Sequence, residues 1–359
     1  MKLLYLADAP YIHTRRWVEH FARLGHDCEV VSFRPATIDG ARVTYVGGFE
    51  ALGKLRYLLQ ARRIAGIIRA GQPDLVHALH LTSYGFLAAL SGFRPLIVSA
   101  WGTDILEAPG LTPFHNWLTR YTLRKADVIT ATGNRLAAAT RRYAPSGTEV
   151  KVVPYGVDIK RFEPTPRVIR DGPSVIGTVA RLSREKGVKY LIRAFDSLNP
   201  GHDAILRIAG DGPERRKLEA EIRRRGLEDR VELRGWVEYE DLPAFLQSLD
   251  IFALPSLYEG FGVAAVEAAA MALPVVASDV HGIPDVVVDG VTGFLRPPGD
   301  AAALAAAFET LIEAPDSRRR LGEAGRAFVA EHYDWQENAA LMGRLYEQAG
   351  RQPNAALVG

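Results

Sequence analysis

The stretch LPSLYEGFGVAAVEA, residues 254–268, decides how the chain is interpreted. An apolar run over residues 250–254 leads into it and predicts a buried strand, the glycines predict a turn, and the alanine-rich remainder predicts a helix. If that helix begins near Gly262, its first backbone N–H groups have no partner within the helix. The partial positive charge at such a helix N-terminus favours an anion such as a phosphate.

Two carboxylates bracket this turn. Glu259 stands just before the helix, and Glu267 lies about 7–8 Å along its axis, at ~1.5 Å per residue. In one interpretation, Glu259 is a solvated loop residue and Glu267 faces water. In the other, the helix is buried, because residues 266 and 268–271 are apolar, and a carboxylate there needs a partner or a ligand. A diphosphate flanked by carboxylates indicates a nucleotide whose ribose and attached group offer hydroxyls.

Length and composition indicate a two-domain globular protein. The chain has 359 residues, of which 48% are hydrophobic and 24% charged. The net charge of +2 argues against a dedicated nucleic-acid binder, although the charge divides into +7 up to Asp158 and −5 after it. The single cysteine excludes an intrachain disulfide. We find no signal peptide and no membrane-spanning run, and therefore expect a cytoplasmic protein, with peripheral contact at the inner membrane face left open.

Short apolar runs alternate with helical patterns along both halves of the chain. Seven runs before Pro154 and six after Pro173 are predicted as strands. This alternation predicts an α/β fold with two facing Rossmann-like, doubly wound domains and a central cleft, with ligands at the carboxyl ends of the strands. We expect an N-terminal domain over residues 1–158, a linker over 159–173, a second domain over 174–334, and a final helix from about 335 that returns to the first domain.

A basic loop follows the predicted strand 175–180. Arg181 and Lys186 are placed where an open α/β sheet binds ligands and would neutralise a departing diphosphate. The alternative is a solvated turn, which we favour for Arg184. The sequence has no Asp-x-Asp pair, the usual means by which a sugar-nucleotide enzyme holds a divalent metal. The charge of the leaving group would then be met by Arg, Lys and helix N-termini, without a metal ion.

Two further strand-to-helix turns contain glycine. Gly210-Asp211-Gly212-Pro213 follows the predicted strand 204–209 and permits close approach of a ligand, although a plain turn needs glycine as well. Gly235-Trp236-Val237 follows the strand 231–234. It either presents backbone groups and an apolar wall to a nucleobase or forms a turn around a core tryptophan.

Together these motifs resemble glycosyltransferase family 4, whose members have the GT-B fold. The resemblance rests on ARLSREKG with Arg181 and Lys186, on AGDGP, on the Gly235–Val237 turn, and on the Glu-x7-Glu motif formed by Glu259 and Glu267. VVPYGVDIKRF at residues 152–162 is similar to the segment that joins the two domains in that family. The resemblance covers essentially the whole chain.

The resemblance implies transfer of a sugar from a nucleoside diphosphate with retention of anomeric configuration, without a cofactor or an essential metal. Arg181 and Lys186 would stabilise the leaving group, Glu259 would contact donor-sugar hydroxyls, and Glu267 the ribose. The donor-binding set would also include Gly210, Asp211, Gly235, Val237, and the backbone of Gly260, Phe261, Gly262 and Val263. The family's Gly-Gly-x-x-Glu segment appears here as HGIPD at 281–285, which leaves the role of Asp285 open.

The acceptor side departs from the family pattern. The loop after the first strand, DAPYIHTRR at residues 8–16, has no glycine, which removes the main support for a dehydrogenase. His13 stands in this loop, where many relatives carry a Gly-Gly pair, and Trp101 stands near the position of a family histidine. Asp104 either hydrogen-bonds substrate hydroxyls or caps the following helix. A dedicated protein base is not required if the leaving diphosphate takes the acceptor proton.

The helical stretch Lys54–Arg69 is basic and amphipathic. It either lies on an anionic membrane or is a solvated helix packed through its Leu and Ile residues. The sequence therefore predicts a bacterial hexosyltransferase of polysaccharide biosynthesis that takes a nucleotide-sugar donor and a glycan, lipid-linked or small-molecule acceptor. The competing hypothesis is a non-catalytic sugar-nucleotide-binding or partner protein on the same scaffold.

Overall fold

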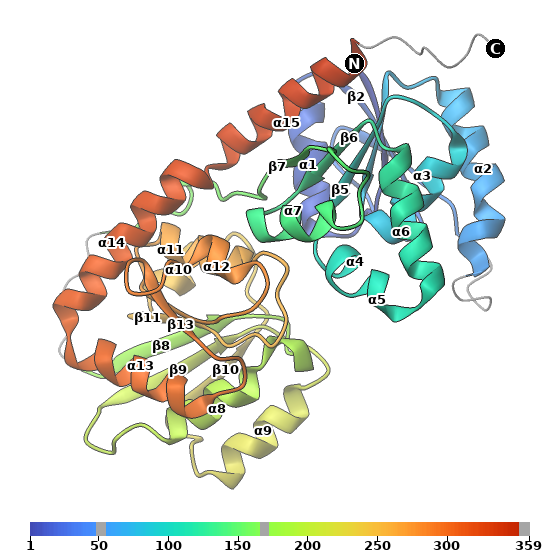
Figure 1. Ribbon diagram of the computed structural model, residues 1–359. Coiled ribbons are helices and arrows are strands. Elements are labelled where there is room, and N and C mark those ends of the chain that lie inside the picture. Colours follow the sequence, from blue (N-terminus) through green and yellow to red (C-terminus); the bar gives the residue numbers. More distant parts are fainter. Residues whose placement is uncertain (48–54, 166–171, 352–359) are drawn as a thin grey trace. The chain divides into compact units, whose positions relative to one another are not determined.

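The computed structural model describes residues 1–47, 55–165 and 172–351. The chain divides into two compact units, one made of Met1–Tyr155 with the chain from Glu337 onward, the other of Gly156–Gln336. Each unit contains a parallel sheet with helices packed against it (Figure 1). Residues 166–171 of the predicted linker and the tail after residue 351 lie outside the described residues, so the linker boundaries stay a prediction.

The first unit contains a seven-stranded parallel sheet, as the alternation of strands and helices predicts. Its order is β3-β2-β1-β4-β5-β6-β7. The strands, in chain order, are β1 (Lys2–Leu6), β2 (Asp27–Ser32), β3 (Ala41–Tyr45), β4 (Leu75–Leu79), β5 (Leu96–Ala100), β6 (Val128–Ala131) and β7 (Val150–Val152).

Helices connect these strands, and three of them are short elements that the sequence pattern misses. The regular helices are α1 (Ile12–Arg23), α2 (Leu55–Gly71), α3 (Phe86–Ser91), α6 (Pro113–Lys125) and α7 (Asn134–Arg141). The missed elements are one turn of π-helix, η2 (Leu81–Gly85), and the helices α4 (Thr103–Leu106) and α5 (Ala108–Leu111). None is long enough to show a helical hydrophobic period.

Alternate residues of the strands pack on opposite faces of this sheet, because side chains point to either side in turn. Leu4 and Leu6 of β1 belong to a core that also contains Ile64 and Ile68 of α2. Tyr5, between them, is fully buried on the other face, where its ring contacts that of Tyr346. Both faces are covered, as expected for a doubly wound sheet.

The last helix, α15 (Trp335–Gly350), is anchored in the first unit by a buried hydrogen-bond chain. His77 Nδ1 lies 2.7 Å from the Tyr346 hydroxyl, and His77 Nε2 lies 2.7 Å from Ser99 Oγ. Ser99 Oγ is in turn 2.6 Å from Thr130 Oγ1. Burial lowers the pKa of His77 to about 3, so the ring is neutral and bonds both hydroxyls. The chain therefore links β4, β5 and β6 to the C-terminal helix.

The described part of α2 fits the second alternative stated for this basic helix. Ile64 and Ile68 are fully buried, whereas Arg62, Arg63 and Arg69 are exposed. The apolar side of this part therefore packs on the sheet, and its charged side chains face water. Residue 54 and the side chains of residues 55–59 lie outside the described part, so the prediction is tested only from Gln60 onward.

The second unit contains a six-stranded parallel sheet in the order β10-β9-β8-β11-β12-β13. The strand order reverses at β8, so β8 and β11 are neighbours although β9 and β10 lie between them in sequence. The strands are β8 (Ser174–Val179), β9 (Ala204–Ala209), β10 (Val231–Gly235), β11 (Ile251–Leu254), β12 (Val275–Ser278) and β13 (Gly293–Arg296). Such a switch point is where open α/β sheets bind ligands.

The helices of this unit match the predicted helical patterns to within a few residues. They are α8 (Val188–Asp196), α9 (Arg215–Arg224), α10 (Leu242–Gln247), α11 (Val263–Ala270), α13 (Ala301–Glu313) and α14 (Pro315–His332). Two one-turn elements, the 3₁₀ turn η3 (Arg184–Lys186) and α12 (Ile283–Val286), are additional.

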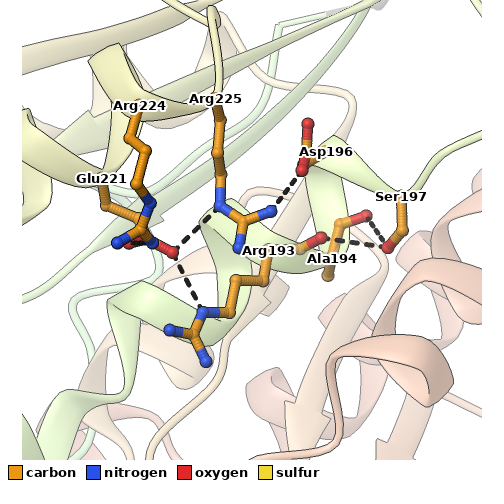
Figure 2. A network of polar contacts seen from close by, with 7 residues as sticks. All are labelled: Arg193, Ala194, Asp196, Ser197, Glu221, Arg224 and Arg225. Atoms are coloured by element: carbon orange, nitrogen blue, oxygen red, sulfur yellow. Dashed lines mark hydrogen bonds and ion pairs between the residues drawn. The ribbon is translucent and has the colours of Figure 1, made fainter.

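An ion-pair network joins α8 to α9 (Figure 2). Glu221 Oε1 accepts from Arg193 Nε at 3.0 Å and from Arg225 Nε at 2.9 Å. Arg225 also pairs with Asp196, and Arg224 with Glu221. The Glu221 carboxylate thus accepts hydrogen bonds from Arg193 on α8 and from Arg225 at the end of α9, and it holds these two helices together.

Candidate active site

The turn quoted at the outset joins β11 to α11 as predicted. The helix begins at Val263, and Gly262 before it has a φ of 94°, a left-handed conformation that favours glycine. Phe261 is 2% exposed and anchors the turn in the core. No side chain caps the first N–H groups of α11. The helix therefore begins with backbone donors and a partial positive charge at the carboxyl end of β11.

Lys186 and Glu259 form an ion pair at this turn. Lys186 Nζ lies 2.6 Å from Glu259 Oε2, and the side chains are only 25% and 16% exposed. The two residues are 73 positions apart in the sequence, and the loops after β8 and β11 bring them together. Glu259 is therefore not a freely solvated loop residue, as the first of the two sequence interpretations would have it.

Backbone contacts hold the two loops in this arrangement. The carbonyl oxygen of Glu185 accepts from the backbone N–H groups of Leu257 at 2.8 Å and Tyr258 at 3.3 Å. A Cβ atom on Gly187 would lie 2.0 Å from the carbonyl oxygen of Pro255, and Gly187 has a φ of 64°. Only glycine satisfies both conditions. The lysine and the glutamate are consequently aligned by main-chain geometry.

The loop after β8 combines exposed cations with one structural acid. Arg181 is exposed, and Lys186 is half-buried. Ser183 Oγ lies 2.5 Å from Glu185 Oε1, and this hydrogen bond lowers the pKa of the Glu185 carboxyl. The Glu185 carboxylate is thus hydrogen-bonded within its own loop, whereas Arg181 is exposed at the end of β8.

The glycine loops after β9 and β10 lie against the loop after β8. A Cβ atom on Gly210 would come within 1.8 Å of the Ala180 carbonyl oxygen, and the Gly210 N–H donates to the Gly235 carbonyl at 2.6 Å. The Leu182 N–H donates to the carbonyl of Asp211 at 2.9 Å. Gly210 is therefore required by close packing between neighbouring loops, whether or not a ligand is bound.

Asp211 and Trp236 of these loops are exposed. The Asp211 carboxylate accepts from the N–H of Gly212 at 2.7 Å and otherwise faces solvent. Trp236 is 69% exposed. The alternative of a core tryptophan in this turn is wrong, because strand β10 ends at Gly235, whose left-handed φ of 75° turns the chain. Gly235 and Val237 are both half-buried.

Glu267 lies within α11 and is 7% exposed. The alternative in which it faces water is therefore wrong, and the apolar surroundings in the sequence correctly indicate a buried helix. Its neighbours Ala265, Val266 and Ala268 are also buried. Its predicted role toward a ribose stays a prediction.

The segment after β12 also reaches this turn. The Gly282 N–H donates to the Glu259 carbonyl at 3.3 Å, and a Cβ atom on Gly282 would lie 2.0 Å from the Gly260 carbonyl oxygen. In this segment, the family pattern in the sequence points only to Asp285 as a candidate. Gly282 packs directly on this turn, and the signal for it in the sequence is the retained second glycine of the Gly-Gly pair.

In the first unit, an aromatic cluster lies beyond the carboxyl ends of β1, β5 and β7. His13 is 9% exposed and stacks on Tyr155, with ring centroids 4.0 Å apart and an interplanar angle of 18°. Trp101 contacts both rings and that of Tyr11, which is 44% exposed. Burial, with a smaller contribution from Arg16, lowers the pKa of His13 to about 3, so the ring is neutral.

Asp104 does not act as a helix cap, and its predicted role toward substrate hydroxyls stays a prediction. It is fully buried, and its carboxylate accepts from the N–H groups of Gly102 at 2.8 Å, Trp101 at 3.1 Å and Leu81 at 2.8 Å. These groups precede helix α4 or belong to η2, so Asp104 does not cap the following helix. The carboxylate instead joins two loops and thereby positions Trp101.

Comparison with known proteins agrees with this architecture. A family model described as "Glycosyl transferases group 1" matches residues 160–328, and one described as "Glycosyl transferase 4-like" matches residues 2–133. The glycogen synthase of Mycobacterium tuberculosis is 30% identical over 307 residues, which cover 81% of this chain and 73% of that protein.

The chain belongs to the family 4-type glycosyltransferases.

The name of a second relative of this glycosyltransferase contains the lipid phosphatidylinositol. The GDP-mannose-dependent α-(1-6)-phosphatidylinositol monomannoside mannosyltransferase of Mycolicibacterium smegmatis is 30% identical over 289 residues, 75% of this chain and 74% of that one. Among solved structures, Anabaena HepE in complex with UDP superposes with a TM-score of 0.84 at 22% identity over 97% of this chain and all of that one. The predicted GT-B fold is thereby confirmed.

The described residues contain neither a metal-binding cluster nor a membrane-spanning helix. In the described ranges, no three His, Cys, Asp or Glu side chains gather closely enough to hold a metal ion. Across the same residues, no helix of the glycosyltransferase is long and apolar enough to cross a membrane.

Proposed function

We propose that this glycosyltransferase is a retaining enzyme that moves a sugar from a nucleoside diphosphate to a hydroxyl acceptor, and that it needs no metal ion. The observation that carries the proposal is the Lys186–Glu259 ion pair, 2.6 Å long, beside the uncapped N-terminus of α11. Cationic and backbone donors there match a diphosphate, and carboxylates match sugar hydroxyls.

In the proposed reaction, the bond between the anomeric carbon and the diphosphate oxygen breaks. The acceptor oxygen bonds to the same face of that carbon, and the acceptor proton passes to the departing diphosphate. Arg181, Lys186 and the first N–H groups of α11 would stabilise the charge that develops on the leaving group. Lys186, held by its ion pair with Glu259, and the backbone N–H groups of α11 are in place before substrate arrives, which is the property that makes electrostatic stabilisation effective.

The two glutamates would divide the donor between them. Glu259 is 16% exposed on the side chain and stands at the turn, where it can accept from hydroxyls of the transferred sugar. Glu267 is buried in the second turn of α11, where it would bind the ribose. Gly210, Asp211, Gly235 and Val237 come from neighbouring loops of the same sheet edge and would complete the nucleotide site.

We propose that the acceptor presents a hydroxyl on a glycan, on a lipid-linked sugar or on a small molecule. The names of the two relatives, a glycogen synthase and a phosphatidylinositol monomannoside mannosyltransferase, cover two of these classes. Tyr11 and Trp101 offer aromatic surface on the first unit, beside the neutral His13. Such a surface suits the apolar face of a sugar ring.

Release of nucleoside diphosphate from UDP-, GDP- and ADP-sugars tests the proposal, after thermal-shift screening has identified the donor. Turnover in the presence of EDTA, with an α-configured product by NMR from an α-linked donor, is the expected result. Inversion at the anomeric carbon would refute the retaining mechanism. Activity that EDTA abolishes and a divalent metal restores would refute the independence from a metal ion. A protein that binds the donor but never releases nucleoside diphosphate, with any acceptor class, would instead be the non-catalytic binder.

A further inference from the structure

Three large apolar side chains project into solvent where α5 meets α6. Leu111 is 61% exposed, Phe114 53% and Trp117 51%. We call these three residues the aromatic corner. They lie on the first unit, at one end of α6 (Figure 1). Exposed apolar side chains are normal when scattered singly, but a contiguous group marks an interaction surface.

The aromatic corner is an ordered surface. The rings of Phe114 and Trp117 stack with centroids 5.8 Å apart, and Trp117 stacks on Tyr121 at 5.4 Å. Leu118 and Leu123 of the same helix are buried in the unit. The Trp117 ring contacts the buried ring of Phe86 on α3, with centroids 6.1 Å apart. The unit therefore supports the aromatic residues from one side, while Phe114 and Trp117 remain 53% and 51% exposed.

The charge beside the aromatic corner is positive. Residues 108–126 contain Arg120, Arg124 and Lys125, all exposed, and no Asp or Glu. The acids that bound this segment are Glu107, which is exposed, and Asp127, which is paired with Arg94. Exposed Trp and Phe followed by Arg and Lys on the same helix match the two layers of an anionic membrane surface, its interface and its headgroups.

Helix α2 does not offer the same combination in its described part. Arg62, Arg63 and Arg69 are exposed there, but Ile64 and Ile68 are buried in the core. This part of α2 supplies charge without an apolar group to insert. Contact through this described part of α2 would thus be electrostatic only, whereas α6 has both components.

We propose that the aromatic corner inserts into the interface of an anionic lipid bilayer, with Arg120, Arg124 and Lys125 bound to the lipid headgroups. The basic helix α2, singled out by the sequence, supplies at most additional charge. The chemistry of the partner follows from charge complementarity together with the exposed Trp and Phe, which favour the boundary between headgroups and acyl chains. This inference goes beyond the proposed function, since it requires no particular donor or acceptor.

Sedimentation of the full chain with vesicles of phosphatidylcholine, alone or with 30% phosphatidylglycerol, tests the inference. We expect binding to the mixed vesicles only. F114S/W117S should weaken it at least tenfold, and R120Q/R124Q/K125Q by about fivefold per charge. R62Q/R63Q/R69Q removes the same charge from α2 and should weaken binding less than the α6 triple variant. L24S/V291S removes two exposed apolar side chains elsewhere and should bind as wild type does.

Four outcomes would overturn the inference. They are absence of binding, equal binding to neutral and anionic vesicles, wild-type binding by F114S/W117S, and an α2 variant that binds as weakly as the α6 variant. A wild-type dimer that F114S/W117S converts to a monomer without lipid would identify the surface as a contact between two copies. Nucleoside diphosphate release without vesicles, which these variants leave unchanged, is measured in parallel. Failure of lipid binding is thereby separated from failure of the proposed function.

Discussion

Exchange of the Lys186–Glu259 pair for neutral residues separates structural from catalytic roles. Replacing Lys186 by Met leaves the Glu259 carboxylate, whose side chain is only 16% exposed, without its cation. Replacing Glu259 by Gln leaves the ammonium group without its anion. Replacing both leaves two neutral side chains of similar size. If the pair served stability alone, the double variant would behave like the wild type in every assay.

The magnitude follows from the 2.6 Å distance between Lys186 Nζ and Glu259 Oε2. At an effective dielectric constant of ~20, the attraction is about 6 kcal/mol before desolvation is subtracted. Hydrogen bonds to charged groups retain about 1.5–3 kcal/mol of net stabilisation. Each single variant should therefore unfold at about 3–12 °C lower temperature, at roughly 2–4 °C per kcal/mol for a unit of this size. The double variant should recover most of this loss.

Activity should follow a different pattern. Lys186→Met removes a group that would stabilise the leaving diphosphate, so turnover should fall about 100-fold or more. Glu259→Gln should mainly lower turnover, and the double variant should be at least as slow as K186M. Unfolding is followed by circular dichroism and turnover by nucleoside diphosphate release. Turnover by K186M within twofold of wild type, or recovery of turnover in the double variant, would refute the proposed catalytic role.

Three further results are expected. Glu267→Ala should raise the donor Kd about tenfold or more by calorimetry with less effect on turnover at saturation; unchanged binding would contradict the ribose role. Gly187→Ala should lower the free energy of unfolding by about 2 kcal/mol or more in urea, because its Cβ would lie 2.0 Å from the Pro255 carbonyl oxygen at a left-handed φ. Gly226→Ala is the control, since Gly226 also has a left-handed φ but open space around its Cβ, and it should cost less stability. The pKa of His77 is about 3 in the folded state and ~6.5 in the unfolded chain, so the unfolded chain binds the proton first as the pH falls. The free energy of unfolding should therefore decrease from about pH 6.5 toward pH 3, by up to about 1.4 kcal/mol per pH unit. His77→Gln should lose less stability than wild type between pH 7 and pH 5, and an equal loss in both would show that His77 is not the group responsible.

The elements of the fold were predictable because the strands of both sheets are short apolar runs and the long helices have a regular period. The buried state of Glu267 was also predictable, since its neighbours along α11 are apolar on all sides. The one-turn elements were not, because three to five residues contain no period. Trp236 could not be placed either: its exposure depends on where β10 ends and how Gly235 turns the chain.

Asp104 shows why the local sequence is insufficient at a site. The sequence suggests a helix cap, but Asp104 lies inside the one-turn helix α4 and its carboxylate also accepts from the N–H of Leu81, 23 residues away. Similarly, Phe114, Trp117 and Leu118 have the spacing of one core-facing stripe, yet Leu118 is buried whereas Phe114 and Trp117 are 53% and 51% exposed. Which residues of an apolar stripe a helix buries depends on the neighbouring elements that it meets.

By itself, the sequence determined the α/β class, the glycine turn before α11 and the residue types that match a diphosphate, because these depend on local patterns and on short motifs. Only the tertiary structure decided that Lys186 pairs with Glu259, that Gly282 supports their turn, that Asp104 serves the Trp101 loop and that α6 carries the exposed aromatic corner. Each of these depends on contacts between segments far apart in the chain. Parallel strands bring their carboxyl ends to one edge of a sheet, but the loops that meet there are selected by strand order and close backbone packing, neither of which a linear pattern specifies.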